Sequence, residues 1–243
     1  MGKRFNSSRW MFVAFLALLL AFECPVLAEL NPSSIEVAKN EMIESLKHYQ
    51  SSYLDIDFPQ RAQEQSKIDQ LIRLYLYNGG EQGYIHSPTR SGKFVIMSKI
   101  LQGLLGRNNH QGLIVVDTLE ALLNSKQMLI RHGGFNKNEV GFYFGQEKTL
   151  NQKIIITTYQ SLALAKDKNI FESKKFPLVL FSEAHHMTAY GASIADNLLK
   201  ESIRLGETAT PWYADQKQVK NLLPDEIYKL STPDAVAKKK LAQ

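Results

Sequence analysis

The residues best suited to chemistry lie in one short stretch, Ser87-Pro88-Thr89-Arg90-Ser91-Gly92-Lys93. An apolar run precedes it and a helix-like run, Phe94–Leu101, follows it, so the stretch is predicted to be a tight loop between a strand and a helix. In such a loop, successive backbone N–H groups and the helix N-terminus surround a phosphate, and a lysine reaches its outer oxygens. Gly92 permits close approach of the backbone, and Lys93 supplies the charge. The stretch therefore predicts a phosphate-binding loop, with an ordinary polar turn as the alternative.

One position departs from the usual pattern of such loops. The pattern is Gly or Ala, four residues, Gly-Lys, and then Ser or Thr, whose hydroxyl is a magnesium ligand. Phe94 stands at that last position. We therefore expect a site that keeps its phosphate lysine and has lost one protein contact to the metal.

A second group of reactive side chains, Ser182-Glu183-Ala184-His185-His186, follows an apolar run about 90 residues further on. A carboxylate at a strand end is placed to organise magnesium or to activate water in a nucleotide hydrolase. The alternatives are an ordinary helix start with incidental histidines and a zinc site. Zinc is disfavoured because adjacent histidines point apart and no third ligand is suitably spaced. For one joint site, Lys93 and Glu183 must lie at neighbouring strand ends.

The elements that must position these groups follow from the periodicity of apolar residues. Helical patterns cover residues 31–77, the second helix running from about Gln60 to Tyr77 after a loop that contains Pro59. Strand and helix patterns then alternate, as in a parallel sheet with crossover helices. Besides the strand at Tyr84 and Ile85, the expected strands are Gly112–Val116, Val140–Phe144, Lys153–Thr157, Leu178–Phe181 and Ile203–Glu207, with helices near 119–131, 159–166 and 189–200. Several strands are apolar on both faces, which predicts an α/β fold, a doubly wound parallel sheet with helices on both faces.

Composition limits the class of protein only loosely. The 243 residues are 44% hydrophobic and 22% charged, which suits one large globular domain or two small ones. The net charge is +5, and Lys3, Arg4 and Arg9 supply three of the positive charges. The body of the chain is thus weakly basic, which permits a local nucleic-acid-binding patch without arguing for one.

The first 28 residues have the pattern of a leader. Basic residues precede an uncharged apolar run from Trp10 to Phe22, and Val26-Leu27-Ala28 offers a signal peptidase site. We expect a cleaved signal peptide, with an uncleaved membrane anchor or a cytosolic chain as alternatives. The protein would then be exported or membrane-anchored by the leader, and otherwise cytoplasmic. The only cysteine, Cys24, lies in the leader, so no disulfide or cysteine metal site is expected beyond it.

Together these segments resemble the first motor lobe of superfamily 2 helicases, in the branch of DEAD/DEAH-box proteins and restriction-enzyme helicase subunits. SPTRSGK is similar to motif I, LIVVDTLEALLNS to motif Ia, IIITTYQSLA to the motif on the next strand, LVLFSEAHH to the DEAH box and GETATP to motif III. The resemblance implies a RecA-like fold of the P-loop NTPase class, ATP and Mg²⁺ as cofactors, and DNA or RNA as partner. The resemblance covers roughly residues 60–235; with the leader and helical patterns described above, the expected division is a leader (1–28), a helical N-terminal extension (29–58) and an ATP-binding lobe (59–243).

The resemblance assigns roles to individual residues. The loop from Pro88 to Lys93 would bind the phosphates. Glu183 would polarise the attacking water, while His185, Thr208 and Thr210 would link the nucleotide site to the nucleic-acid groove. Gln65 stands about where the family places a glutamine that reads adenine, with Gln60 and Gln63 nearby.

The departures from the family pattern fall on the metal. Phe94 replaces the ligating hydroxyl, and Ser182 replaces the aspartate that holds the metal's water shell, which leaves a weak contact through water. Losing about 4 kcal/mol of metal stabilisation would leave roughly a thousandth of the activity. The printed sequence also ends about thirty residues after GETATP, before the family's second lobe, so a second chain would have to supply that lobe.

Three functions stay open at this point. The first is a lobe of an ATP-dependent helicase or translocase, with weak or no turnover alone. The second is a degenerate, non-enzymatic lobe that serves as a binding or interaction module. The third is an exported protein that uses its sheet for an unrelated partner, which follows if the leader is cleaved. Contact with a membrane is expected only through an uncleaved leader.

Overall fold

The computed structural model describes residues 34–54, 59–164, 168–171, 175–187, 199–211 and 219–237. The leader lies outside the described residues, as does most of the helix predicted at 189–200, so both stay predictions. Residues 34–243 belong to one compact unit.

The elements alternate along the chain much as their sequence patterns predict. In order they are α2 (Ser34–Lys47), α3 (Pro59–Tyr77), β1 (Gln82–His86), α4 (Lys93–Leu105), β2 (Gly112–Val116), α5 (Leu119–Gly133), β3 (Val140–Phe144), β4 (Glu147–Lys148), β5 (Ile154–Thr158), α6 (Tyr159–Ala163), β6 (Leu178–Ser182), β7 (Ile203–Thr208), β8 (Asp225–Lys229) and α9 (Thr232–Ala237). Short 3₁₀ helices lie at Lys137–Glu139, Lys168–Phe171, Ala184–His186 and Val219–Asn221.

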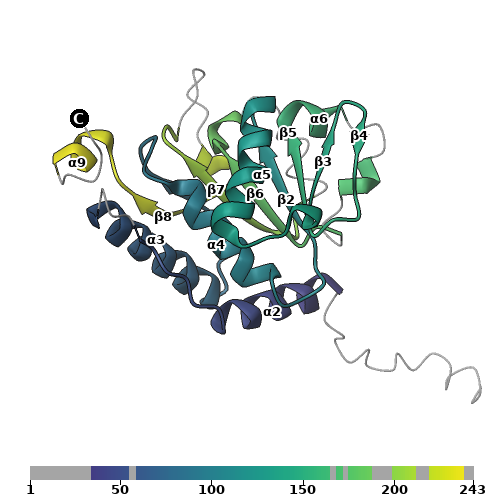
Figure 1. Ribbon diagram of the computed structural model, residues 1–243. Coiled ribbons are helices and arrows are strands. Elements are labelled where there is room, and N and C mark those ends of the chain that lie inside the picture. Colours follow the sequence, from purple (N-terminus) through teal and green to yellow (C-terminus); the bar gives the residue numbers. More distant parts are fainter. Residues whose placement is uncertain are drawn as a thin grey trace, which may run out of the picture. The chain divides into compact units, whose positions relative to one another are not determined.

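The described strands form one sheet in the order β4-β3-β5-β2-β6-β7-β1-β8 (Figure 1). The paired strands are parallel except for the antiparallel pair of β3 and β4. The prediction of a doubly wound, largely parallel sheet is confirmed. The expectation that the loop strand β1 and the glutamate strand β6 are neighbours is wrong, because β7 pairs with both and lies between them.

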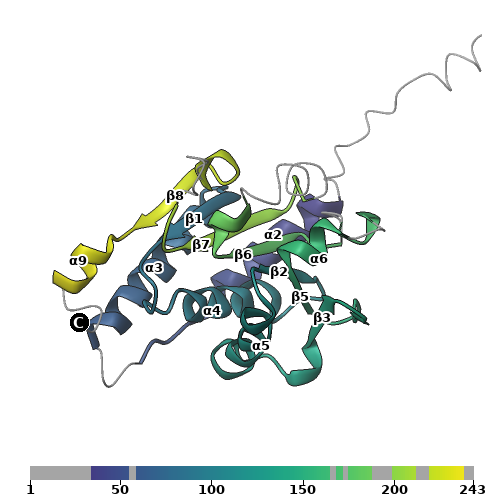
Figure 2. The same ribbon diagram turned by 90° about the horizontal axis from the view of Figure 1, so that it is seen from above.

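Helices cover both faces of the sheet. The helices α3, α4 and α5 lie on one face, and α6 lies on the other (Figure 2). Side chains of a strand point alternately to its two faces. Accordingly, Leu178 and Leu180 of β6 pack in the cluster under α4, and Val179 and Phe181 pack in the cluster on the α6 side.

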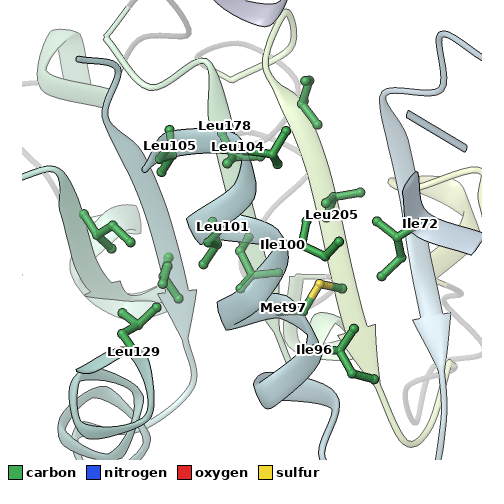
Figure 3. Close-up of a cluster of buried hydrophobic side chains, with 14 of the residues drawn as sticks. Ile72, Ile96, Met97, Ile100, Leu101, Leu104, Leu105, Leu129, Leu178 and Leu205 are labelled. Carbon is green, nitrogen blue, oxygen red and sulfur yellow. The ribbon is translucent and has the colours of Figure 1, made fainter. Parts of the chain in front are cut away.

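The central helix of this arrangement is α4. Its buried apolar residues recur at helical spacing and are at most 3% exposed: Ile96, Met97, Ile100, Leu101, Leu104 and Leu105. Figure 3 shows these side chains close to Leu178 of β6, Leu205 of β7, Ile72 of α3 and Leu129 of α5. Because this packing fixes the whole helix over the sheet, it also fixes the position of Lys93 at its first turn.

Pro59 begins α3, contrary to the expectation that it lies in a loop. The first N–H groups of a helix have no partner within it, and the ring of proline already holds a helical φ, so proline is well tolerated there. Further along the helix, Arg73 joins α3 to the end of α2: its Nη1 donates to Leu46 O at 2.9 Å and to Tyr49 O at 3.0 Å, while its Nε bonds Asp69 at 2.7 Å.

Within the described part of the chain, every helix is too short or too polar to cross a membrane.

Candidate nucleotide-binding site

The loop between β1 and α4 leads into a helix start that has no side-chain cap among the described residues. Gly92 adopts a left-handed conformation with φ +80° immediately before α4, and no described side chain caps the helix. The loop is held from the other side, since Ser87 N–H donates to Thr208 O of β7 at 3.0 Å and Ser91 N–H donates to Pro88 O at 3.3 Å. An uncapped start of a 13-residue helix presents backbone donors and the positive end of the helix dipole to an anion.

The side chains of the loop divide into buried and exposed groups. Pro88 and Lys93 are buried, whereas Thr89 and Arg90 are exposed. Lys93 Nζ donates to Pro88 O at 3.2 Å, so the ammonium group lies folded back over the loop. The lysine is thus positioned at the loop as predicted, while Thr89 and Arg90 can contribute through their backbone.

A carboxylate that the sequence interpretation missed lies against the loop lysine. Glu207 Oε2 is 3.6 Å from Lys93 Nζ, and Glu207 Oε1 accepts a hydrogen bond of 2.6 Å from Ser182 Oγ. Strand geometry explains this position: Glu207 comes two residues after Leu205 and so shares the face under α4. The register also places Ser182 directly beside Glu207 on the neighbouring strand. The sequence could have indicated this position of Glu207, because in the GETATP segment it continues the alternation of Ile203 and Leu205, which face α4.

The surroundings of Glu207 tie the two predicted halves of the site together. Burial raises the pKa of the Glu207 carboxyl, Lys93 and the Ser182 hydroxyl oppose that effect, and the charge of Glu183 adds to it. Because Glu207 contacts Lys93 through one oxygen and Ser182 through the other, the loop and the end of β6 form one site even though β7 separates their strands.

Beyond β6, hydrogen bonds connect the histidine of the DEAH-like segment to β7. Thr208 Oγ1 donates to Thr210 O at 2.9 Å and lies 2.9 Å from His185 Nδ1. A hydroxyl has one hydrogen, so Nδ1 of His185 must carry the proton in this contact. Burial and the neighbouring His186 lower the pKa of His185, which favours the neutral ring. Its Nδ1 also lies 3.5 Å from Glu183 Oε2.

Asp117, at the end of β2, is a second carboxylate that the sequence interpretation did not single out. Its Oδ2 lies 3.7 Å from His186 Nε2. The ends of β2, β6 and β7 therefore bring carboxylates and histidines to the same edge of the sheet.

Two residues of the site hold an unusual backbone conformation. In the described part of the chain, the non-glycine residues with positive φ are Arg90 at 66° and Glu183 at 46°. Such conformations cost on the order of 1–3 kcal/mol each and concentrate at functional sites. Both lie in the segments that the sequence indicated.

Gln65 reaches the loop from α3. Its Nε2 donates to Ser91 O at 3.2 Å, and a Cβ atom added to Gly92 would lie 2.1 Å from that nitrogen. A cavity of about 300 Å³ opens beside this contact. It is lined by Tyr53, Leu54, Arg61, Gln65, Gly92, Val95, Lys99 and His132. The structure thus brings the predicted glutamine to the loop and adds a cavity next to it.

Buried polar atoms at the loop indicate what the site can hold. Ser87 Oγ, Ser91 Oγ and Glu207 Oε2 are buried and have no hydrogen-bond partner among the described residues. Such atoms are rare in native proteins and call for an explanation. Two hydroxyls next to a lysine and a helix start suit phosphate oxygens, which accept hydrogen bonds.

The residues present also fit a magnesium ion carried mainly by phosphate. No three His, Cys, Asp or Glu side chains in the described residues cluster to hold a metal by themselves. Magnesium at phosphate sites needs only one or two protein contacts, because water and phosphate supply the rest. Phe94 offers no oxygen and Ser182 offers only a short hydroxyl that is bonded to Glu207, whereas Glu207 Oε2 is a carboxylate oxygen beside Lys93 and fits such a contact.

The fold and the site define a RecA-like lobe of the P-loop class, an ATP-binding domain of the helicase type. A family profile described as "Type III restriction enzyme, res subunit" matches residues 34–212, and the chain belongs to that family.

Relatives and solved structures agree with this assignment. A Halobacterium salinarum protein named for the DNA 3′–5′ helicase Rad25 is 26% identical over 165 residues, which are 68% of this chain and 26% of that protein. The DNA 3′–5′ translocase XPB2 of Sulfurisphaera tokodaii is 31% identical over 137 residues, 56% of this chain and 29% of its own length. The chain thus spans about a quarter of these relatives. The helicase domain of Pyrococcus furiosus Hef shares the fold, with a TM-score of 0.54 and 20% identity over 73% of this chain and 39% of its own.

Proposed function

We propose that this chain is the ATP-binding lobe of a DNA-dependent ATPase of the helicase or translocase type. The observation that carries the proposal is that Lys93 at the start of α4 lies beside Glu207, while the buried hydroxyls of Ser87 and Ser91 in the same loop have no hydrogen-bond partner among the described residues. DNA is the preferred polymer because the two relatives described above are named for DNA helicase and translocase activities.

The loop binds the triphosphate. Lys93 gives up its hydrogen bond to Pro88 O and its contact with Glu207, and turns to the outer phosphate oxygens. The backbone N–H groups from Thr89 onward and the uncapped start of α4 donate to the inner phosphate. The hydroxyls of Ser87 and Ser91 complete the set of donors. Magnesium, when bound, neutralises the charge that develops between the β- and γ-phosphates.

The cavity beside Gln65 receives the base. Its position next to Gly92 supports this role, since a base must lie within the reach of phosphates held by the loop. Gln65 has an amide that can pair with the edge of adenine, and Arg61 has a guanidinium that can stack on its face. The exposed aliphatic side chain of Leu54 lines the same cavity.

Glu183 activates the attacking water, and His185 links the nucleotide site to the DNA-binding side of the lobe. The Glu183 carboxylate, whose residue follows the last residue of β6, accepts a proton from the attacking water. Neutral His185 carries the change at Glu183 to Thr208, and Thr208 passes it to Thr210 through two hydrogen bonds. Turnover by this lobe alone is expected to be weak, because Phe94 offers the metal no oxygen.

A second candidate is a degenerate lobe that binds nucleotide without hydrolysing it. The side chain of Phe94 favours it, since it packs against the apolar cluster under α4 instead of offering a hydroxyl to the site. The two candidates differ in hydrolysis and agree in nucleotide binding.

The test is a titration of the chain with a fluorescent ATP analogue, followed by phosphate release with and without DNA. Lys93→Met should weaken binding about 100-fold, since charge-assisted bonds to phosphate are worth about 1.5–3 kcal/mol each. Lys39→Met is the matched control, because Lys39 is also buried and ion-paired. Its partners are Glu36 and Glu81, and Glu81 lies just before β1, at the end of the strand opposite to the phosphate loop. Equal binding by the two variants would refute the proposal.

Hydrolysis is then compared in wild type and Glu183→Gln. DNA-stimulated phosphate release that disappears in Glu183→Gln, with ATP binding kept, supports the ATPase. Binding without any release supports the degenerate lobe.

A further inference from the structure

We propose that Glu207 takes over the role of the aspartate that Ser182 has replaced, so that the water shell of magnesium is held from β7 instead of β6. The inference rests on the proposed ATP-binding function. Glu207 belongs neither to the phosphate loop, where Phe94 replaces the metal-binding hydroxyl, nor to the DEAH-like segment, where Ser182 replaces the aspartate.

The register of the sheet places Glu207 directly beside Ser182, at the end of the neighbouring strand. Ser182 and Glu207 are partners on adjacent parallel strands, and each follows alternate apolar residues that pack under α4. Their side chains therefore leave the sheet on the same face. Glutamate is one methylene longer than aspartate, and serine is short, so the carboxylate of β7 can reach back over the end of β6. The bond of 2.6 Å from Ser182 Oγ to Glu207 Oε1 shows that it does so.

The other oxygen of Glu207 faces the loop. Glu207 is 3% exposed, and its Oε2 lies 3.6 Å from Lys93 Nζ. Beyond this ion pair, Oε2 has no hydrogen-bond donor among the described residues. A buried carboxylate oxygen is costly without a donor. A water molecule of a hydrated magnesium ion is such a donor, and Lys93 marks the place where the phosphates and hence the metal must lie.

The structure offers a second role for the same contacts, in which Glu207 only neutralises Lys93. That role predicts that removing the charge of Glu207 tightens ATP binding equally with and without metal. A metal role predicts that the removal mainly affects the part of the affinity that depends on magnesium. The two roles thus differ in a measurable quantity.

The experiment measures the dissociation constant of the fluorescent ATP analogue in EDTA and in magnesium, for the full chain. Manganese with electron paramagnetic resonance detection gives a second reading, because free and protein-bound Mn²⁺ have different spectra. The variants are Glu207→Gln, the double variant Ser182→Asp/Glu207→Gln, and Glu226→Gln. Glu226 serves as the control carboxylate, since it lies on the edge strand β8 and is exposed.

The expected result is that magnesium tightens binding by wild type and by Glu226→Gln about tenfold or more, equivalent to about 1.4 kcal/mol. Glu207→Gln should lose most of that gain and most of the bound Mn²⁺. The double variant should regain both, because it returns a carboxylate to the end of β6. This rescue also distinguishes a metal role from a loss of folding, which thermal unfolding of each variant monitors.

The inference is overturned if Glu207→Gln keeps the metal dependence of wild type, or if wild type binds the analogue equally well in EDTA and in magnesium. In both cases the proposed ATP-binding function stands. If wild type fails to bind the analogue under either condition, the proposed function itself fails.

Discussion

Replacing Gly92 with alanine perturbs the phosphate loop in two ways that can be measured separately. The backbone at Gly92 has φ +80°, and the new Cβ would lie 2.1 Å from Gln65 Nε2. The left-handed conformation costs an alanine about 1–2 kcal/mol, partly offset by about 0.4–1 kcal/mol from the less flexible unfolded chain. Gln65 must also turn away from Ser91 O, and the bond that it loses is worth about 1 kcal/mol. We expect Gly92→Ala to lower the free energy of unfolding by about 2 kcal/mol in total.

Gly134 provides the matched control. It ends α5 with φ +72°, and no described heavy atom lies within 4 Å of a Cβ added there. Gly134→Ala therefore carries the conformational cost without the contact, and we expect it to lower the free energy of unfolding by about 1 kcal/mol.

Urea unfolding at pH 7.5 gives the free energies for wild type, Gly92→Ala, Gly134→Ala, Gln65→Ala and the double variant Gln65→Ala/Gly92→Ala. In the Gln65→Ala background, the cost of Gly92→Ala should fall to that of Gly134→Ala, because the clash is gone. Equal costs for Gly92→Ala and Gly134→Ala in the presence of Gln65 would refute the contact between α3 and the loop, and with it the proposed role of Gln65 at the base.

Three further predictions concern the frame of the site. Leu104→Ala should lower the free energy of unfolding by about 2–5 kcal/mol, because Leu104 is fully buried, whereas exposed Leu123→Ala should stay within about 0.5 kcal/mol of wild type; similar losses in urea unfolding would contradict the described core. Arg73→Met should lower it by about 3 kcal/mol, since it leaves Asp69 buried without its charge partner, and proteolysis near residue 50 should then become faster. Burial lowers the pKa of His86 in the folded chain. Below a pH of about 6.5 the unfolded chain therefore binds a proton that the folded chain does not bind, and the free energy of unfolding should fall as the pH drops from about 7.5 to about 5.5. His86→Asn should flatten this dependence, and parallel curves for the two proteins would rule out the contribution of His86.

Local patterns predicted most of the fold. The strand, loop and helix around Lys93 follow from residues that are adjacent in the chain, and the central strands follow from apolar runs that are buried on both faces. The edge strand β8 was missed because it lacks such a run: of Asp225–Lys229, only Tyr228 is buried. The other edge strand, β4, has two exposed residues and no periodicity to detect.

The site could be predicted only in part, because its geometry depends on which distant strands pair with one another. The loop lysine, the glutamate of the β6 end and the histidine were identified as separate motifs, but the order of strands that joins them cannot be read from one sequence. The insertion of β7 between β1 and β6 made the expected adjacency wrong and brought Glu207 to Lys93. The contact between Ser182 and Glu207 joins residues 25 positions apart, so it is visible only once the register is known.

In the proposed function, the loop after β1 and the ends of β6 and β7 together hold a triphosphate. The most direct measurement is a crystal structure of the full chain with a non-hydrolysable ATP analogue and magnesium. We expect the phosphates against the N–H groups of Ser91, Gly92 and Lys93, with Lys93 Nζ moved from Pro88 O to a phosphate oxygen and the base beside Gln65. An analogue bound elsewhere on the protein, or a Lys93 that keeps its contacts with Pro88 and Glu207, would contradict the proposed function.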